Sequence, residues 1–237
     1  MKINCKLTIK NLSCLYFNKN SNLIKTNFKM FLLLNKSSKF LTEFKHLKKN
    51  NYNLYKQSFC SSNFNDPFCN TSLNIREKIG RNLYKNIDHP IGIITQMIKN
   101  YFIDNKVIKS KHNYLINDKY NKSNEFKLFD SFSPIVSVKE CFENLLVEPT
   151  HETLSPKNTY YINKDNVLRT HMTTHDVQLM KDGHKAIISV GDVYRRDTID
   201  GTHYPVFHQL DGFKVFNTTN KQIVFEDLKF CLENLIK

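Results

Sequence analysis

The sequence predicts an α+β fold in which a mainly antiparallel sheet is flanked by helices. Two long runs of strand-forming residues, 186–194 and 204–216, follow one another with a short connection between them, a pattern typical of antiparallel pairing. Apolar residues recur at helical spacing in 91–102 and again in 224–235. Because the strand-like stretches have no long helices between them, we expect the helices to pack on one side of the sheet.

The first 65 residues differ in composition from the rest of the chain. They hold twelve lysines and a single acidic residue, Glu43, and so contribute +11 of the formal net charge of +13. A basic, acid-poor segment with many hydroxyl side chains is typical of an organellar presequence, which we expect to be largely disordered. A plain disordered basic tail is the alternative. The range 66–237 is then expected to form the folded domain.

Cysteine spacing and hydropathy exclude several classes of protein. The six cysteines form no CxxC pair, which predicts reduced thiols and neither a zinc site nor a disulfide framework. The longest apolar run, 30–34, is far shorter than the ~20 residues that a membrane span requires.

The remaining elements follow from local signals. The first helix is expected to begin at Pro90 with Asp88 as its cap and to end near Phe102. Polar, aperiodic residues 104–125 predict a surface insertion. Further strands are expected at 133–138 and 158–162, and further helices at 141–146 and 173–180.

Strand alternation predicts which polar side chains share a face. Arg195 continues one long strand, while Gln209 and Asp211 lie on one face of the next, together with Phe207 and Phe213. Antiparallel pairing would bring Arg195, Gln209 and Asp211 onto one floor. A guanidinium group suits a phosphate, and a carboxylate suits an ammonium group. The same pattern would also fit a two-sided polar strand with ordinary surface ion pairs.

Two adjoining stretches carry a resemblance to a known family. Residues 191–197 read Gly-Asp-Val-Tyr-Arg-Arg-Asp, and residues 202–211 read Thr-His-Tyr-Pro-Val-Phe-His-Gln-Leu-Asp. Together they resemble motif 2 of the class II aminoacyl-tRNA synthetases, in particular the phenylalanine-specific branch in its single-chain mitochondrial form. Other stretches agree in the same order, with 133–136 resembling the end of motif 1: 80–83, 89–90, 142–146 and 168–171. The similarity covers about 76–103 and 126–216.

The resemblance implies a partial class II synthetase catalytic fold and phenylalanine–tRNA ligase activity. Such an enzyme condenses phenylalanine with ATP to an adenylate and passes the aminoacyl group to tRNA(Phe). It also implies Mg²⁺ as a companion of ATP, a monomeric state, passage through an organelle import machinery, and a location in the mitochondrion or another translating organelle. Motif 3 and the C-terminal anticodon-binding domain of the family cannot fit within 217–237, so the chain as it stands is expected to be inactive.

The resemblance also assigns site residues. Arg195 matches the arginine that contacts the α-phosphate, and His171 matches a histidine beside the activated carbonyl, so both are expected to be catalytic. The expected ATP-binding residues are Arg195, Asp197, Thr202, His203 and Tyr204. The expected amino-acid-binding residues are Thr173, Thr174, His175, Asp176, Gln209, Leu210 and Asp211. Three positions depart from the family pattern: Asp197 and Asp211 stand where it usually has Glu, and Asp176 where it usually has Gln.

Two other functions stay open at this point. A synthetase-like binding module that has lost catalysis would also fit Asp176 and the missing C-terminal motifs. His171 and His175 stand at the i, i+4 spacing that can bind zinc from one helix face, although the glutamate of HExxH is absent. A metal-dependent hydrolase that uses this histidine cluster is therefore the weaker alternative, and we expect no metal ligand.

Overall fold

The computed structural model describes residues 64–103, 125–201, 203–216 and 220–236, together with the backbone of 16–17 and 24–32. The predicted insertion 104–125 lies outside the described residues, apart from its last position. Most of the predicted presequence, 1–65, lies outside them as well.

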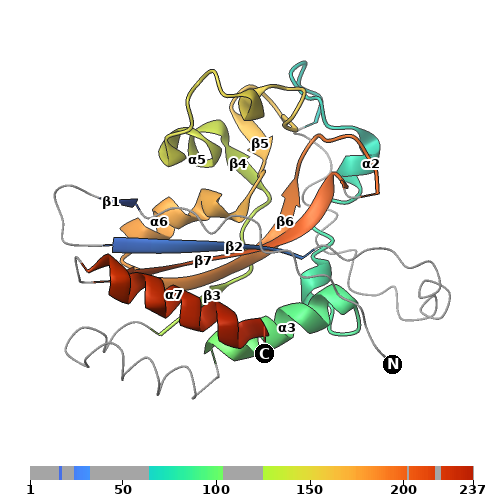
Figure 1. The fold of residues 1–237 in the computed structure, drawn as a ribbon. Helices are drawn as coiled ribbons and strands as arrows, with labels where there is room; N and C mark the ends of the chain where they lie inside the picture. The colour runs from blue at the N-terminus through green and yellow to red at the C-terminus, as the bar shows by residue number, and fades with distance from the viewer. Residues whose placement is uncertain are drawn as a thin grey trace.

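A five-stranded sheet forms the centre of the molecule, and its strand order is β1-β2-β7-β6-β3 (Figure 1). All neighbouring strands are antiparallel except β3 and β6, which are parallel. The bounds are β1 Tyr16–Phe17, β2 Ile24–Leu32, β3 Lys127–Phe129, β6 Ala186–Tyr194 and β7 Val206–Phe216. The mainly antiparallel sheet and the long strand pair predicted from the sequence are both confirmed.

Strand β2 lies within the range expected to be a presequence. Its nine residues pair antiparallel with β7, from Ile24 opposite Phe216 to Leu32 opposite His208. The pairing supplies backbone partners along the edge of β7, an edge that would otherwise offer unpaired N–H and C=O groups.

Two helices, α3 (Pro90–Ile103) and α7 (Lys221–Ile236), cover one face of the sheet (Figure 1). The core on this face joins apolar side chains from both helices to the sheet: Tyr84, Ile98, Phe102, Ile188, Val190, Leu210, Cys231 and Leu232. Both helices lie where their apolar periodicity predicted them.

The cap of α3 differs from the expectation. His89, and not Asp88, accepts the N–H of Ile91 through its Nδ1 at 3.2 Å, and its carbonyl accepts the N–H of Ile93.

The opposite face of the sheet carries shorter elements. A two-stranded ribbon of β4 (Ile135–Ser137) and β5 (Asn166–Leu168) lies above it with α5 (Val138–Cys141) and α6 (Asp176–Lys181) (Figure 1). A 3-10 helix, η5 (Met172–His175), connects the ribbon to α6. The remaining short helices are α2 Leu73–Arg76, η1 Leu83–Lys85, η3 Glu143–Leu145 and η4 Glu152–Leu154.

The strand predicted at 158–162 is wrong. In this range only Tyr161 forms an isolated bridge, with Val167, and the strand of this region is β5. The reason is a partner that is distant in the sequence, because the N–H of Tyr161 donates to the side chain of Asn70 at 2.7 Å and its carbonyl accepts the N–H of Asn70 at 3.2 Å. A side-chain amide thus takes the place of a neighbouring strand.

Candidate active site

The floor of the candidate site is the face of β6 and β7 that points away from α3 and α7. Gly191 lies directly opposite Gln209, and Ser189 lies opposite Asp211. The Gln209 and Asp211 side chains are fully buried, so both must find partners inside the fold. The side-chain oxygen of Gln209 accepts the N–H of Met172 at 3.3 Å, whereas its Nε2 has no hydrogen-bond partner among the described residues.

Arg195 lies at the end of this floor, immediately after β6. Its N–H donates to the carbonyl of Pro205, and its Nε donates to the carbonyl of Thr170 at 3.1 Å. Its guanidinium lies 5.2 Å from the ring centroid of Phe207, within the range of a cation–π contact. Burial lowers the pKa of Arg195 from its usual value, but an arginine remains charged at any physiological pH. The structure thus brings Arg195 onto the same face as Gln209 and Asp211, as alternation predicted.

The η5 segment lies against the floor. The hydroxyl of Thr173 donates to Oδ2 of Asp211 at 2.6 Å, and the N–H of Gly212 donates to Oδ1 of the same carboxylate at 3.1 Å. Nδ1 of His171 lies 3.3 Å from the hydroxyl of Thr174, which also donates to the Sγ of Cys141 at 3.5 Å. Thr173 and His171 are therefore held on the same side of the sheet as the polar floor.

His175 is wedged between a cation and an aromatic ring. Nη1 of Arg169 lies 3.2 Å from its Nε2, and its ring stacks on Phe132 with centroids 4.0 Å apart. Because an arginine can only donate, Nε2 must be the unprotonated nitrogen of the imidazole. Burial, and secondly the charge of Arg169, lower the pKa of His175 to about 3. The imidazole is thus neutral at physiological pH. Asp176, the next residue, is completely buried.

The other residues that the resemblance assigns to ATP binding belong to the connection between β6 and β7. Asp197, His203 and Tyr204 are exposed there. The ring of His203 pairs with Asp200, with 2.7 Å between Nδ1 and Oδ2. Thr202 lies outside the described residues. The connection follows Arg195 directly, so these side chains lie near one end of the floor, away from Asp211.

Leu210 is placed differently from the expectation. It belongs to the core between the sheet and α3 and α7, on the opposite face from Gln209 and Asp211. The cause is the pleat of β7, since consecutive residues of a strand point to opposite faces. Its side chain therefore cannot line the amino-acid site.

Three residues near the site were not predicted from the sequence. Arg169 and Phe132 surround His175, and Gly191 opens the floor beside Gln209. Arg169 stands in one of the stretches that carried the resemblance, and a lone arginine directly after the apolar residues Val167 and Leu168 is a signal that could have marked it. Gly191 opens the stretch 191–197, and a glycine inside a strand often marks the close approach of another group. Phe132 gave no comparable signal.

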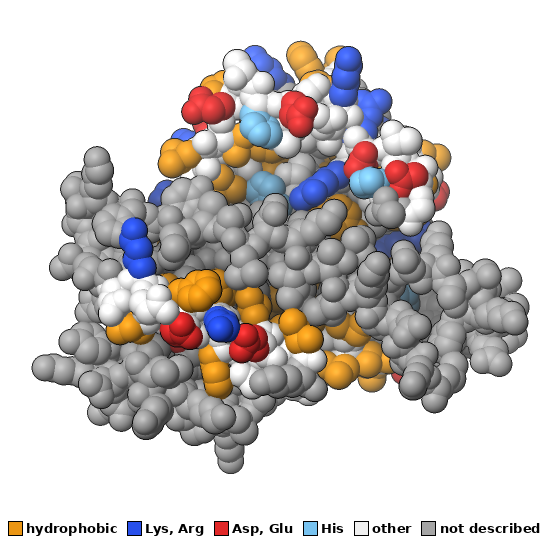
Figure 2. Space-filling view, in the orientation of Figure 1, with side chains coloured by type: hydrophobic (Ala, Val, Ile, Leu, Met, Phe, Trp, Pro, Cys, Tyr) orange, Lys and Arg blue, Asp and Glu red, His pale blue; other side chains and the backbone are white. Residues whose placement is uncertain are grey.

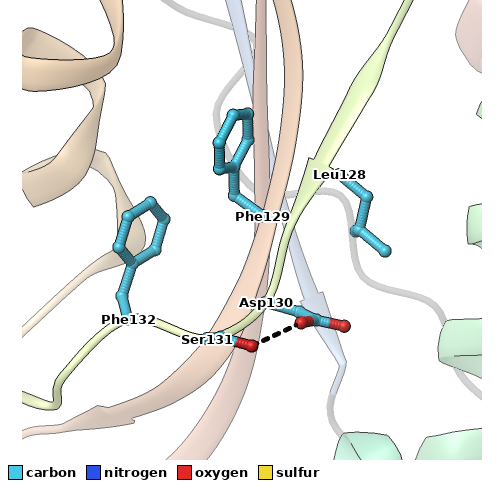
Figure 3. Close-up of a pocket in the computed structure, with 5 residues that line it drawn as sticks. All are labelled: Leu128, Phe129, Asp130, Ser131 and Phe132. Atoms are coloured by element: carbon cyan, nitrogen blue, oxygen red, sulfur yellow. Dashed lines mark hydrogen bonds between the residues drawn. The ribbon is translucent and has the colours of Figure 1, made fainter.

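A hollow of about 210 Å³ flanks the site along the segment 128–132. Figure 3 shows Phe129 and Phe132 on one side of this segment and Leu128 on the other, with the hydroxyl of Ser131 bonded to the carboxylate of Asp130. The rings of Phe129 and Phe132 stack with centroids 5.9 Å apart. The aromatic stack of Phe129, Phe132 and His175 therefore forms an apolar wall beside the polar floor.

Charge on the described surface is mixed. In the view of Figure 2, basic, acidic and histidine side chains are interspersed over the upper part of the molecule and do not form one basic patch. Within the described ranges, no group of three or more His, Cys, Asp or Glu side chains is arranged to hold a metal ion. No helix among those residues is long and apolar enough to cross a membrane.

Comparison with known proteins agrees with this geometry. The sequence profile of the tRNA synthetases class II core domain (F) matches residues 72–237. The chain is 48% identical over 147 residues to the mitochondrial phenylalanine–tRNA ligase of Dictyostelium discoideum, which covers 62% of this chain and 30% of the relative. It is 40% identical over 180 residues to the chloroplastic/mitochondrial phenylalanine–tRNA ligase of Arabidopsis thaliana. This match covers 73% of the chain and 38% of the relative. The chain thus spans about a third of the length of these curated relatives. It belongs to the family of class II tRNA synthetase core domains of the (F) type.

Proposed function

We propose that the protein activates phenylalanine with ATP and transfers it to tRNA(Phe) in organellar translation. The observation that carries the proposal is the shared floor of Arg195, Gln209 and Asp211, with Thr173 bonded to Asp211 above it. This arrangement combines a cation suited to phosphate with a carboxylate suited to an ammonium group. Three relatives of the chain are named as phenylalanine–tRNA ligases, one of them as a probable one.

In the proposed reaction, a carboxylate oxygen of phenylalanine attacks the α-phosphorus of ATP, and pyrophosphate leaves. Arg195 would stabilise the negative charge that builds on the α-phosphate, because a preorganised cation in a half-buried site needs no reorganisation. Asp211, held by Thr173 and Gly212, would receive the substrate ammonium. His171 would lie beside the activated carbonyl. Catalysis would then rest on positioning and charge more than on covalent chemistry.

The same proposal covers the binding of ATP and Mg²⁺, the oligomeric state and the import of the protein. Arg195 and the exposed side chains of Asp197, His203 and Tyr204 are chemically suited to ATP, and Thr202 belongs to the same set through the resemblance. Mg²⁺ would accompany its phosphates, where it commonly keeps several waters and needs few protein ligands. We further propose that the protein is monomeric. Organellar import would be directed by residues 1–65, consistent with the mitochondrial and chloroplastic/mitochondrial names of its relatives.

The test is phenylalanine-dependent ATP–pyrophosphate exchange in the complete protein with Arg195→Ala. Loss of a group that acts on transition-state charge is typically worth about 3 kcal/mol, on the order of a hundredfold in rate. Arg196→Ala is the matched control, because this neighbouring arginine is exposed and donates to the carbonyl of Pro156. Exchange that is unchanged in Arg195→Ala would show that the motif 2 assignment is wrong. Phenylalanine binding without exchange in the unmodified protein would favour the binding module.

A further inference from the structure

Arg169 is the largest fully buried side chain of the molecule's described part, with 2% of its surface exposed. Its backbone joins two layers of the fold. The N–H of Arg169 donates to the carbonyl of Pro134 at 2.9 Å, and its own carbonyl accepts the N–H of Tyr194 at 3.0 Å. Residue 169 therefore links the segment before β4 to the end of β6.

The guanidinium of Arg169 contacts both of these parts of the fold and a third segment, η5. Nε donates to the carbonyl of Asp192 at 2.7 Å, and Nη1 lies 3.3 Å from the carbonyls of both Phe132 and Ser133. Nη1 also faces Nε2 of His175 at 3.2 Å. A buried cation is tolerated where its donors find partners, and here carbonyl oxygens and an imidazole face Nε and Nη1. One side chain thus holds β6, the link between β3 and β4, and the end of η5.

Gly191 makes room for this arrangement. A Cβ at position 191 would lie 2.2 Å from Nη2 and 2.9 Å from Cζ of Arg169, and 2.8 Å from Sδ of Met172. Real Cβ atoms do not approach other atoms so closely, so a side chain at 191 would have to displace the guanidinium of Arg169 and the thioether of Met172. Since Gly191 pairs directly with Gln209, Arg169 lies on the site face of the sheet, at the level of the glutamine.

The residues that follow Arg169 contact each polar side chain of the floor. The carbonyl of Thr170 accepts from Nε of Arg195, the N–H of Met172 donates to Gln209, and the hydroxyl of Thr173 donates to Asp211. The position of the 170–173 segment therefore determines how the side chains of Arg195, Gln209 and Asp211 are oriented. A displacement of this segment would move the groups proposed to contact phosphate and ammonium.

We propose that Arg169 is a positioning residue of the activation site and that Gly191 is its obligatory partner. The inference rests on the proposed function and adds to it. Arg169 acts through the segment 170–173, whose height above the strands it fixes. Lysine is a poor substitute, because an ammonium group lacks the planar fork that reaches several carbonyls at once.

A double-mutant cycle of Arg169→Lys and Gly191→Ala tests the proposal. Kinetics of phenylalanine-dependent exchange and the melting temperature are measured for the wild type, both single variants and the double variant. Each single change is expected to lower kcat on the order of a hundredfold, the typical result of misplacing reacting groups by about 1 Å. The double variant is expected to lose little more than either single one, because both changes disrupt the same contact. Gly191→Ala retains every donor of Arg169. If Arg169→Lys does not fold, the kinetics of Gly191→Ala alone therefore test whether Arg169 positions the site.

The matched control is Lys214→Met, which removes another buried cation from the opposite face of β7. Lys214 pairs with Asp227 of α7 at 3.0 Å and contacts none of the site residues named above. The Lys214→Met variant is expected to have a lower melting temperature. At temperatures below its unfolding transition, kcat and the KM values for phenylalanine and ATP should be unchanged. The same pattern in Arg169→Lys would reduce Arg169 to a structural residue and overturn the proposal. Additive kinetic losses in the double variant would overturn the partnership with Gly191. A wild type without exchange would refute the proposed function itself, whereas the melting temperatures of the cycle would still report the Arg169–Gly191 contact.

Discussion

Acidification is expected to destabilise the fold through His175 before the carboxylates are protonated. His175 lies against the guanidinium of Arg169 and stacks on Phe132. Burial and the charge of Arg169 lower the pKa of the imidazole to about 3, and Glu140 raises it only in part. Protonation would place a second cation 3.2 Å from the first, in a site with little water.

The direction and size of the pH effect on the free energy of unfolding follow from proton linkage. The pKa of His175 is about 3 in the folded state and 6.5 for an unperturbed histidine, so between these values the unfolded chain binds more protons. The free energy of unfolding is therefore fully retained above pH 6.5 and falls as the pH drops toward 3. The slope approaches about 1.4 kcal/mol per pH unit and is half of that at pH 6.5, so the loss amounts to about 2 kcal/mol between pH 6.5 and 4.5. Burial, and secondly His208, lower the pKa of His89 as well, so His89 adds to the same trend.

Urea unfolding between pH 4.5 and 7 measures this effect, because most carboxylates stay ionised in that window. His175→Gln removes the titrating ring and retains a hydrogen-bond acceptor for Arg169. It is expected to flatten the pH dependence, whereas His89→Gln, the matched histidine control, should remove only a smaller part. A pH slope in His175→Gln equal to that of the wild type would refute the reasoning. It would mean that the ring gains solvent or a new partner when it is protonated.

Three further predictions concern separate parts of the chain. Asp227→Ala leaves Lys214 buried without its carboxylate and should cost about 3–5 kcal/mol of unfolding free energy in urea titrations; the joint replacement Lys214→Met with Asp227→Leu should restore much of the loss, and a small loss in the single variant would contradict the buried pair. Asp176→Gln should keep or improve phenylalanine activation, with tyrosine activated detectably, since an apolar pocket rejects a hydroxyl only by about a hundredfold; complete loss of exchange would assign Asp176 a direct role. Residues 1–65 fused to a fluorescent reporter should carry it to an organelle, whereas a diffuse cytosolic signal would leave a plain basic tail.

Periodicity was sufficient to predict the elements that bury apolar side chains. The helices α3 and α7 and the strands β6 and β7 all present regular apolar faces, and each lies within a few residues of its expected range. The segment 158–162 has the composition of a strand but forms none, because Asn70, far away in the sequence, supplies its hydrogen bonds. Local propensity contains no information about such a partner.

The site was predictable only in part for a similar reason. Alternation correctly grouped Arg195, Gln209 and Asp211, because all three depend on one strand pair. The role of Arg169 depends on the carbonyls of Phe132 and Asp192, which reach it from two different segments. The resemblance grouped Leu210 with its neighbours in the sequence, but the pleat separates it from them.

The two faces of β7 explain why the register of the β6–β7 pair must be fixed so firmly. Gln209 and Asp211 belong to the site, whereas His208 and Leu210 belong to the layer beneath α3 and α7. A slip by one residue would exchange these two sets and bury the site polar groups under the helices. Contacts on both faces oppose such a slip. On the helix side, His208 lies directly opposite Asp192 and pairs with its carboxylate at 2.7 Å.

On the site side, the guanidinium of Arg169 fits only where a strand residue lacks a Cβ. Gly191 is the only glycine of β6, and it stands opposite Gln209. A slipped strand would present Val190 or Asp192 to the guanidinium, and the side chain of either would clash with it. The contact of Arg169 with Gly191 thus fixes which face of β6 is turned to the site, and the pair of Asp192 with His208 fixes the register of β7 against β6. That register is the one that brings Arg195, Gln209 and Asp211 together.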